Sequence, residues 1–314
     1  MMAQRRNRRP PSSSSATTGG EGGEPSLRGK LLTMEPMSRH TSWRVGGPAQ
    51  RFYIPADVDD LAAFLGALPE QEPIHWLGLG SNLLVRDQGV RGTVIATSGA
   101  LNKISLVAPD RVRAEAGVAS AKVARFCVNH GLTGAEFLAG IPGTVGGALA
   151  MNAGAFGGEF WTLVEAVETV DRRGQRRTRP ASEYGIGYRS VKVPASEWFV
   201  AAHLKLARGE HAQARTLIKS LLAKRGATQP TQLPNAGSVF KNPPGDHAAR
   251  LIEAAGLKGE CIGGACVSEL HANFIVNAGT ASANDIERLI EHVRTVVERR
   301  FGVRLETEVR VIGE

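Results

Sequence analysis

The sequence is short of cysteine and of aromatic residues, and each shortage excludes a class of protein. Its three cysteines, Cys127, Cys261 and Cys266, form no CxxC pair. We therefore expect buried thiols in a reducing compartment rather than a disulfide framework, and no metal site. Aromatic residues make up 5% of the chain, whereas glycine occurs 37 times. This composition favours tight turns and close backbone approaches over a large aromatic core.

Signals for export and membrane insertion are also missing. The basic N-terminus runs into Pro10, Pro11 and a Ser/Thr/Gly stretch without an apolar segment, which is unlike a secretory signal. The one long uncharged stretch, residues 137–158, is rich in glycine and contains Pro142, so it would form a poor membrane helix. We expect a cytoplasmic protein that does not insert into membranes.

The formal net charge of +8 is unevenly distributed along the chain. Four positive charges lie in the first ten residues, at Arg5, Arg6, Arg8 and Arg9, which leaves 8 − 4 = +4 for the rest. A mildly basic body suits an anionic small molecule, whereas nucleic-acid binding needs a concentrated patch. Residues 1–26 contain little to bury, so we expect a disordered basic tail. Nucleic-acid binding through this tail is the weaker interpretation, because the tail has no interleaved aromatics.

The hydrophobic pattern predicts three folded units, at residues 27–100, 101–208 and 209–314. Helical spacing predicts helices over 57–67, 119–130, 212–225, 248–255 and about 284–299, with Asp57 as the cap of the first. Short apolar or alternating runs predict strands, among them 49–54, 164–170, 198–206 and 303–312. Helices and strands mix without a regular βαβ alternation, which indicates an α+β fold.

Two glycine-rich turns are the strongest candidates for ligand contact. The first, GLGSN at 78–82, follows an apolar strand. A dinucleotide-binding fingerprint would need glycine at position 83, where Leu83 stands, and a helix that the sequence does not predict. A plain turn and a turn whose N–H groups wrap a phosphate both fit. The second, GIPGTVGGA at 140–148, has no GK[ST] and would let the backbone approach a flat or phosphorylated ligand.

These turns carry a family resemblance. GLGSN followed by LLVRD, with GIPGTVGGA downstream, resembles the FAD-binding module of the vanillyl-alcohol oxidase/PCMH type. That resemblance implies two small α+β lobes with the FAD pyrophosphate between the glycine turns. Four further motifs are similar to the UDP-N-acetylenolpyruvoylglucosamine reductases, in the form lacking the tyrosine-loop insertion: TSWRVGGPA (41–49), NAGSVFKNP (235–243), HANFIVN (271–277) and FGVRLETEVRVIG (301–313). The resemblance covers about Leu31 to the end and implies a smaller α+β substrate-binding domain at 209–314.

The resemblance also implies an activity. Members of this family use FAD, with NADPH as the hydride-donating co-substrate, to reduce UDP-N-acetylenolpyruvoylglucosamine to UDP-N-acetylmuramate for peptidoglycan synthesis. We accordingly expect a UDP-sugar substrate, no nucleic-acid partner, and a monomer or weak oligomer. An FAD-linked oxidase built on the same module is the alternative enzyme.

Three residues match the family's catalytic positions. Ser238 matches the proton donor, although a serine in NAGS is more often a turn-stabilising residue. Glu308 matches the catalytic carboxylate. Strand alternation alone places it on a solvated face with Arg304, Glu306 and Arg310. Arg189 belongs to a Tyr-Arg pair suited to a carboxylate or enolate, but the family's serine two residues further on is Val191 here, with Ser190 beside it.

The remaining site residues are carried over from the family's motifs. For FAD binding these are Arg44, Gly46, Gly80, Ser81, Asn82, Gly143, Thr144, Gly146, Gly147 and Asn152. For substrate binding they are Tyr188, Arg225, Lys241, Asn242, His271 and Asn273. Lys241 is also a candidate to tune the acidity of Ser238. Arg225 either reaches a diphosphate or interacts with the carbonyls of its own helix.

Overall fold

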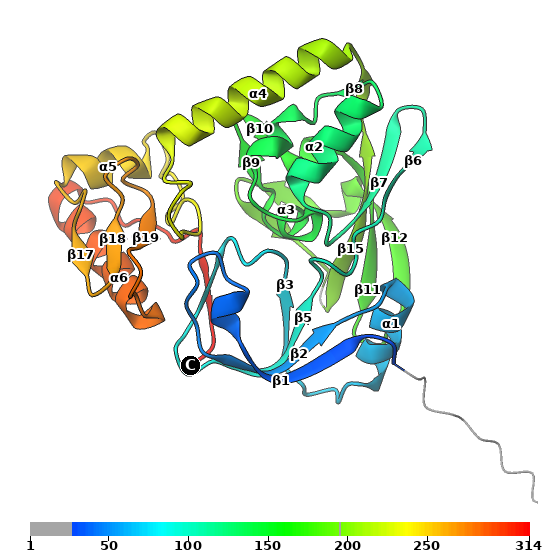
Figure 1. Ribbon diagram of the computed structural model, residues 1–314, viewed down its shortest axis with the longest axis horizontal. Helices are drawn as coiled ribbons and strands as arrows, with labels where there is room; N and C mark the ends of the chain where they lie inside the picture. The colour runs from blue at the N-terminus through cyan, green and yellow to red at the C-terminus, as the bar shows by residue number, and fades with distance from the viewer. Residues whose placement is uncertain (1–26, 195) are drawn as a thin grey trace, which may run out of the picture.

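The computed structural model describes residues 27–194 and 196–314 (Figure 1). The tail predicted at 1–26 lies outside these residues. The fold is α+β, as the sequence indicates, and its units can be followed from blue to red in Figure 1. Within the described residues no helix is both long and apolar enough to cross a membrane.

Lobe 1, residues 27–100, is built on a four-stranded sheet in the order β1-β2-β5-β3. Strands β2, β5 and β3 are parallel, whereas β1 is antiparallel to β2. Helix α1 begins where predicted, because the side chain of Asp57 accepts a hydrogen bond from the backbone N–H of Asp60 at 2.9 Å. The elements are β1 (Lys30–Pro36), η1 (Met37–Arg39), β2 (Pro48–Ile54), α1 (Val58–Ala67), β3 (Ile74–Leu77), β4 (Leu83–Val85) and β5 (Val90–Ala96).

Lobe 2, residues 101–208, is an antiparallel five-stranded sheet in the order β12-β11-β15-β7-β6, with α2 and α3 packed into its core. The glycine-rich stretch, expected as a loop, contains the short helix α3. Its elements are β6 (Ile104–Ala108), β7 (Arg111–Glu115), α2 (Ser120–Asn129), β8 (Leu132–Thr133), η2 (Glu136–Gly140), α3 (Val145–Met151), β9 (Gly154–Ala155), β10 (Gly158–Glu159), η3 (Phe160–Leu163), β11 (Val164–Asp171), β12 (Arg176–Pro180), η4 (Ala181–Glu183), β13 (Gly185–Gly187), β14 (Ser190–Lys192), β15 (Glu197–Lys205) and β16 (Ala207–Arg208).

Helix α4 (His211–Thr228) connects lobe 2 to the rest of the chain. It packs on η2, α2 and β8 of lobe 2, and Figure 1 shows it extending from that lobe towards the last part of the chain. The predicted boundary at 209 stays a prediction. Residues 229–314, which follow this helix, are called the C-terminal unit.

The C-terminal unit packs α5 and α6 against a three-stranded sheet, β17-β18-β19. Helix α6 begins with a capping box in which the side chains of Ser282 and Asp285 bond to each other's backbone N–H. The elements are α5 (Ala248–Ala254), β17 (Cys261–Ile262), β18 (Ala265–Val267), β19 (Ile275–Asn277), α6 (Ala283–Phe301) and β20 (Arg310–Ile312).

The C-terminal unit and lobe 1 are interlocked. Strand β20 returns to lobe 1 and pairs in parallel with β4. In the opposite direction, Trp43 of lobe 1 is fully buried in the core of the C-terminal unit, where its Nε1–H donates to the carbonyl of Ile275 at 2.7 Å. Asn277 donates back to the carbonyl of Trp43 at 2.9 Å. The segment around Trp43 and the segment 275–277 are far apart in the sequence, and their contacts form the joint between lobe 1 and the C-terminal unit.

Two expectations need correction. The predicted strand 303–312 is too long, since regular pairing is limited to Arg310–Ile312, with one bridge from Thr307 to Phe240. Around that bridge the N–H of Lys241 donates to the carbonyl of Glu306 and the N–H of Glu308 donates to the carbonyl of Val239, so this segment pairs only briefly with 239–241. The expectation of buried thiols is wrong for Cys261 and Cys266, which form a disulfide across the β17–β18 hairpin. It holds for Cys127, where burial raises the pKa of the thiol to about 12.

Candidate active site

A cavity of about 840 Å³ lies where lobe 1, lobe 2 and the C-terminal unit meet. Lobe 1 contributes mainly the segment 74–83, and lobe 2 contributes parts of 140–156 and 189–199. The C-terminal unit adds Ser238 and Glu308. The volume is within the range of small-molecule sites. Among residues 27–194 and 196–314, no group of three or more His, Cys, Asp or Glu side chains is placed to hold a metal ion.

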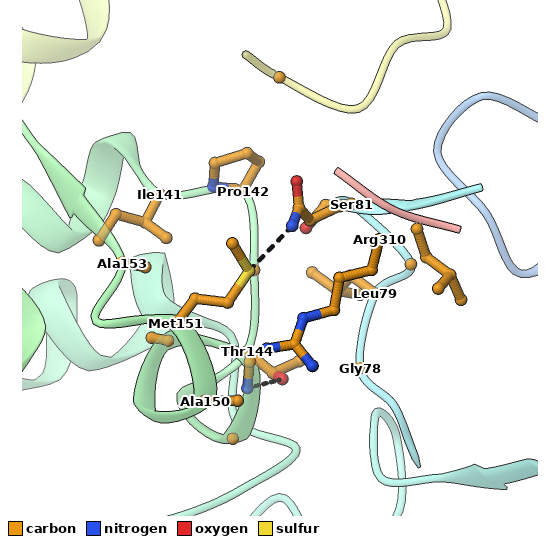
Figure 2. Close-up of a pocket in the computed structure, with 18 of the residues that line it drawn as sticks. Gly78, Leu79, Ser81, Ile141, Pro142, Thr144, Ala150, Met151, Ala153 and Arg310 are labelled. Atoms are coloured by element: carbon orange, nitrogen blue, oxygen red, sulfur yellow. Dashed lines mark hydrogen bonds between the residues drawn. The ribbon is translucent and has the colours of Figure 1, made fainter. Parts of the chain in front are cut away.

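The two glycine turns face each other across this cavity. A Cβ added at Gly78 would lie 2.5 Å from Oγ1 of Thr144, so the absence of a side chain lets the turns approach. Thr144 caps α3, and its Oγ1 accepts from the N–H of Gly147 at 3.4 Å (Figure 2). The motifs GLGSN and GIPGTVGGA are thus parts of one site.

The lobe 1 turn exposes hydrogen-bond donors. Gly80 has a φ of +62°, and a Cβ there would lie 2.1 Å from the carbonyl of His40, so only glycine fits. Within the described chain, the backbone amides of residues 78–82 donate no hydrogen bond to the protein. Successive amides without partners form a concave site that suits an anion.

Arg310 is a site residue that strand alternation missed. Figure 2 shows its side chain extending towards Thr144, beside Met151, from strand β20. It makes no side-chain hydrogen bond or ion pair with any residue of 27–194 or 196–314, so its charge is available to a ligand. The signal in the sequence was its position two residues after Glu308, on the same side of an extended segment. Without knowledge of what that side faces, it was assigned to solvent.

Arg189 and Glu308 form an ion pair that joins lobe 2 to the C-terminal unit. Arg189 lies between β13 and β14 with a φ of +50°, and its Nε is 3.0 Å from Oε1 of Glu308. This N–H is buried but is not aligned with an acceptor in the described residues. The other two nitrogens donate to the carbonyls of Asn152 and Gly154, at 3.2 and 3.0 Å.

Glu308 and Glu306 differ in how far their side chains are buried. The side chain of Glu308 is 15% exposed, and burial raises its pKa above the usual value, against the opposing effects of Arg189 and Lys241. The side chain of Glu306 is 77% exposed and pairs with Lys241 at 3.3 Å. Sequence alternation treated these two carboxylates alike, whereas only Glu308 lines the cavity.

Ser238 lies on a loop fixed from both sides. Asn273, which is buried, donates to the carbonyl of Phe240 at 2.8 Å and accepts from its N–H at 3.0 Å. The backbone N–H of Glu308 donates to the carbonyl of Val239 at 2.8 Å. The residue after Ser238 is therefore bonded directly to the residue that pairs with Arg189, and all three candidate catalytic residues line the cavity.

The structure brings many of the predicted residues to the cavity. Those lining it are Ser238, Arg189, Glu308, Gly80, Ser81, Asn82, Gly143, Thr144, Gly146, Gly147 and Arg225. Arg225 lies in the last turn of α4, and its Nε donates to Oε1 of Gln229 at 3.2 Å.

The other predicted residues are not among those lining the cavity: Arg44, Gly46, Asn152, Tyr188, Lys241, Asn242, His271 and Asn273. Asn152 and Asn273 are buried and bond to protein groups. The side chain of Asn242 accepts from Ala248 at the start of α5, at 3.1 Å. Their roles towards ligands stay predictions.

Four of the residues that do not line the cavity are in turns or make local contacts with neighbouring residues. Tyr188 is 49% exposed, with the guanidinium of Arg189 5.2 Å from its ring centre. Burial lowers the pKa of His271, whose Nδ1 accepts from the N–H of Asn273 at 3.3 Å. Arg44 and Gly46 lie in a turn with φ of +59° and +121° next to the buried Trp43.

Comparison with known proteins matches the lobes and the C-terminal unit. Residues 49–178 match the FAD binding domain family, and residues 229–312 match the family described as UDP-N-acetylenolpyruvoylglucosamine reductase, C-terminal domain. A UDP-N-acetylenolpyruvoylglucosamine reductase from Methylococcus capsulatus is 61% identical over 287 residues, covering 91% of this chain and 94% of the relative. One from Alkalilimnicola ehrlichii is 59% identical over 286 residues, covering 91% and 96%.

A solved structure is also similar over its whole length. The crystal structure of UDP-N-acetylenolpyruvylglucosamine reductase from Thermus caldophilus superposes with a TM-score of 0.78 at 33% sequence identity. The match covers 91% of this chain and 99% of that one.

Proposed function

The chain belongs to the family of UDP-N-acetylenolpyruvoylglucosamine reductases, and we propose that it reduces UDP-N-acetylenolpyruvoylglucosamine to UDP-N-acetylmuramate with FAD as cofactor and NADPH as hydride donor. One observation carries the proposal. Ser238 and the Arg189–Glu308 ion pair lie in the same cavity as the two glycine turns. An acid, a cation and a carboxylate thus share a cavity with an anion-binding turn.

The cavity fits FAD. The amides of residues 78–82, which have no protein partner in the described chain, and the uncompensated charge of Arg310 suit a diphosphate. On the opposite wall, a Cβ added at Gly143 would lie 3.6 Å from Oγ of Ser81, an ordinary van der Waals distance, so the two turns lie close together there. When bound, FAD supplies the hydride chemistry between NADPH and substrate, while the protein supplies orientation and electrostatics.

Arg189 supplies the cation that the substrate's chemistry requires. Reduction of an enol ether on a carboxylate builds negative charge on the carbon next to that carboxylate and on its oxygens. A fixed guanidinium in a buried site stabilises such charge without reorganisation. The buried Nε–H of Arg189, unaligned with any acceptor in the described residues, is the donor we assign to a carboxylate or enolate oxygen.

Ser238 supplies the proton in this proposal. Its Oγ–H bond breaks as a C–H bond forms on the substrate carbon, and the serine regains a proton from solvent afterwards. The bonds from Val239 and Phe240 to Glu308 and Asn273 hold the loop that carries Ser238 at the cavity. Arg225, at the cavity edge on α4, is the cation we assign to the UDP diphosphate.

The test separates the two half-reactions by anaerobic stopped-flow spectrophotometry. Purified protein should show a flavin spectrum that NADPH bleaches and the enolpyruvyl sugar nucleotide restores. Ser238→Ala should keep the first half-reaction and slow the second by about 10²–10⁴-fold, the usual contribution of a positioned acid. Ser190→Ala is the matched control, because this exposed serine lies outside the cavity lining.

Three outcomes would contradict the proposal. Colourless protein that cannot be reconstituted with FAD would exclude a flavoenzyme. Flavin reoxidised rapidly by oxygen, with no response to the enolpyruvyl sugar nucleotide, would favour the oxidase. Normal restoration of the flavin spectrum in Ser238→Ala would mean that another group donates the proton.

A further inference from the structure

Asn152 is a fully buried polar residue at the C-terminal end of α3, where its φ is +47°. Its side chain bonds to three residues in two other segments, 159–161 and the hairpin that contains Gly187. Nδ2 donates to Oε2 of Glu159 at 2.8 Å and to the carbonyl of Gly187 at 3.1 Å. Oδ1 accepts from the backbone N–H of Trp161 at 3.2 Å. A buried amide bonded in this way fixes the segments that it joins, because any lost bond would leave a buried polar group unsatisfied.

Two of the contacts made by Asn152 determine the placement of Arg189. Gly187 ends β13, two residues before Arg189, so Nδ2 holds the hairpin arm from which the arginine projects. The backbone carbonyl of Asn152 then accepts from Nη1 of Arg189, beside the bond from Nη2 to Gly154. With one N–H of each terminal nitrogen bonded to these carbonyls, the guanidinium presents Nε towards Glu308.

Helix capping alone does not account for this side chain. The left-handed position after a helix favours glycine or asparagine, and glycine would serve it at least as well. A cap would not need an amide that reaches Gly187 in a separate hairpin. We propose that Asn152 is a positioning residue that orients Arg189 for the substrate carboxylate, an inference that rests on the proposed function.

The variant Asn152→Gly removes the amide and keeps the left-handed backbone accessible. Flavin reduction by NADPH should stay near the wild-type rate. The second half-reaction should slow by about 10–100-fold, as a misplacement of about 1 Å does in other enzymes. Trp161→Phe is the control for local destabilisation: its Nε1–H donates to Leu149 at 2.8 Å in the same part of lobe 2, without touching Arg189. It should leave both half-reactions near wild type.

A double-mutant cycle tests whether the amide acts through the arginine. In an Arg189→Met background, adding Asn152→Gly should not slow the second half-reaction further, because the group that it orients is already gone. An equal slowing in both backgrounds would overturn the proposal.

Chemical labelling provides a readout that needs no turnover. Phenylglyoxal modification of FAD-loaded protein, quantified by peptide mass spectrometry, should label Arg189 several-fold faster in Asn152→Gly than in wild type or Trp161→Phe. Arg113, which is paired with Glu168 in the same lobe, is the internal control and should not change. Unchanged labelling of Arg189 would overturn the positioning role. A wild-type protein whose reduced flavin ignores the enolpyruvyl sugar nucleotide would instead refute the proposed function, and the labelling result would still stand.

Discussion

Replacing Trp43 with phenylalanine tests how strongly the joint between lobe 1 and the C-terminal unit stabilises the protein. The indole is fully buried in the core of the C-terminal unit, and its Nε1–H bonds to the carbonyl of Ile275 at 2.7 Å. Phenylalanine removes the donor, which costs about 1–3 kcal/mol when the acceptor stays buried. The smaller ring also leaves a cavity, at about 1 kcal/mol or more. We therefore expect a loss of roughly 3 kcal/mol in the free energy of unfolding.

Urea denaturation followed by circular dichroism would measure this loss, and a lower midpoint with an unchanged m value is the expected form. Trp161→Phe is again the comparison, since it removes a similar buried indole bond inside lobe 2. Hydrogen exchange should distinguish the two variants. Amides of β4 and β20 should exchange faster in Trp43→Phe and at the wild-type rate in Trp161→Phe. A loss below about 1 kcal/mol, the size of one ordinary hydrogen bond, would refute the idea that Trp43 holds the joint.

Two further predictions concern stability away from the site. Arg28 holds the pKa of Asp57 down at about 2, from an ordinary 3.8, so the stabilisation by this carboxylate is complete above about pH 4 and is lost as the pH falls towards 2. Asp57→Ala should lower the free energy of unfolding by about 1 kcal/mol at neutral pH, because the helix loses its cap. Urea titrations at pH 7 and pH 3 should show a smaller loss at pH 3, and an equal loss at both pH values would contradict the assignment. The disulfide closes a loop of residues 261–266. By lowering the entropy of the unfolded chain it should stabilise the folded protein by roughly 2 kcal/mol. A reducing agent should therefore lower the melting temperature of the wild type but not of Cys266→Ser, and equal responses would contradict this.

The parts of the fold that could be predicted from the sequence are those determined by neighbouring residues. Asp57 and Ser282 cap helices because each side chain reaches a backbone N–H three residues away. The failure at 303–309 has the same origin. Alternating residues predict a long strand only if a partner lies alongside its whole length. Here residues 306–308 pair briefly with 239–241, and regular pairing with another strand begins only at Arg310.

The surroundings of several site residues could not be predicted from the sequence, because they depend on partners far along the chain. Asn152 and Asn273 are expected at the site from the glycine-rich stretch and from the family's HANF motif. The structure shows both side chains bonded to protein groups in other segments, and their roles towards ligands stay predictions. Glu308 and Glu306 alternate identically, and only the arrival of Arg189 from lobe 2 distinguishes them. The family motifs point to Glu308 but not to Arg310 two residues later, whose side chain has no hydrogen-bond or ion-pair partner among residues 27–194 and 196–314.

Because β20 pairs with β4, the site can form only after β20 has been synthesised. Glu308, Arg310 and Ile312 line the cavity, and they follow both lobes along the chain, so they are synthesised after them. Lobe 1 and lobe 2 can begin to fold while the chain is still growing, since domains fold as units from the N-terminal side. The third wall can form only after residues 308–312 have been synthesised and β20 has paired with β4. A ligand that needs all three walls can therefore bind fully only after the C-terminal unit has joined lobe 1.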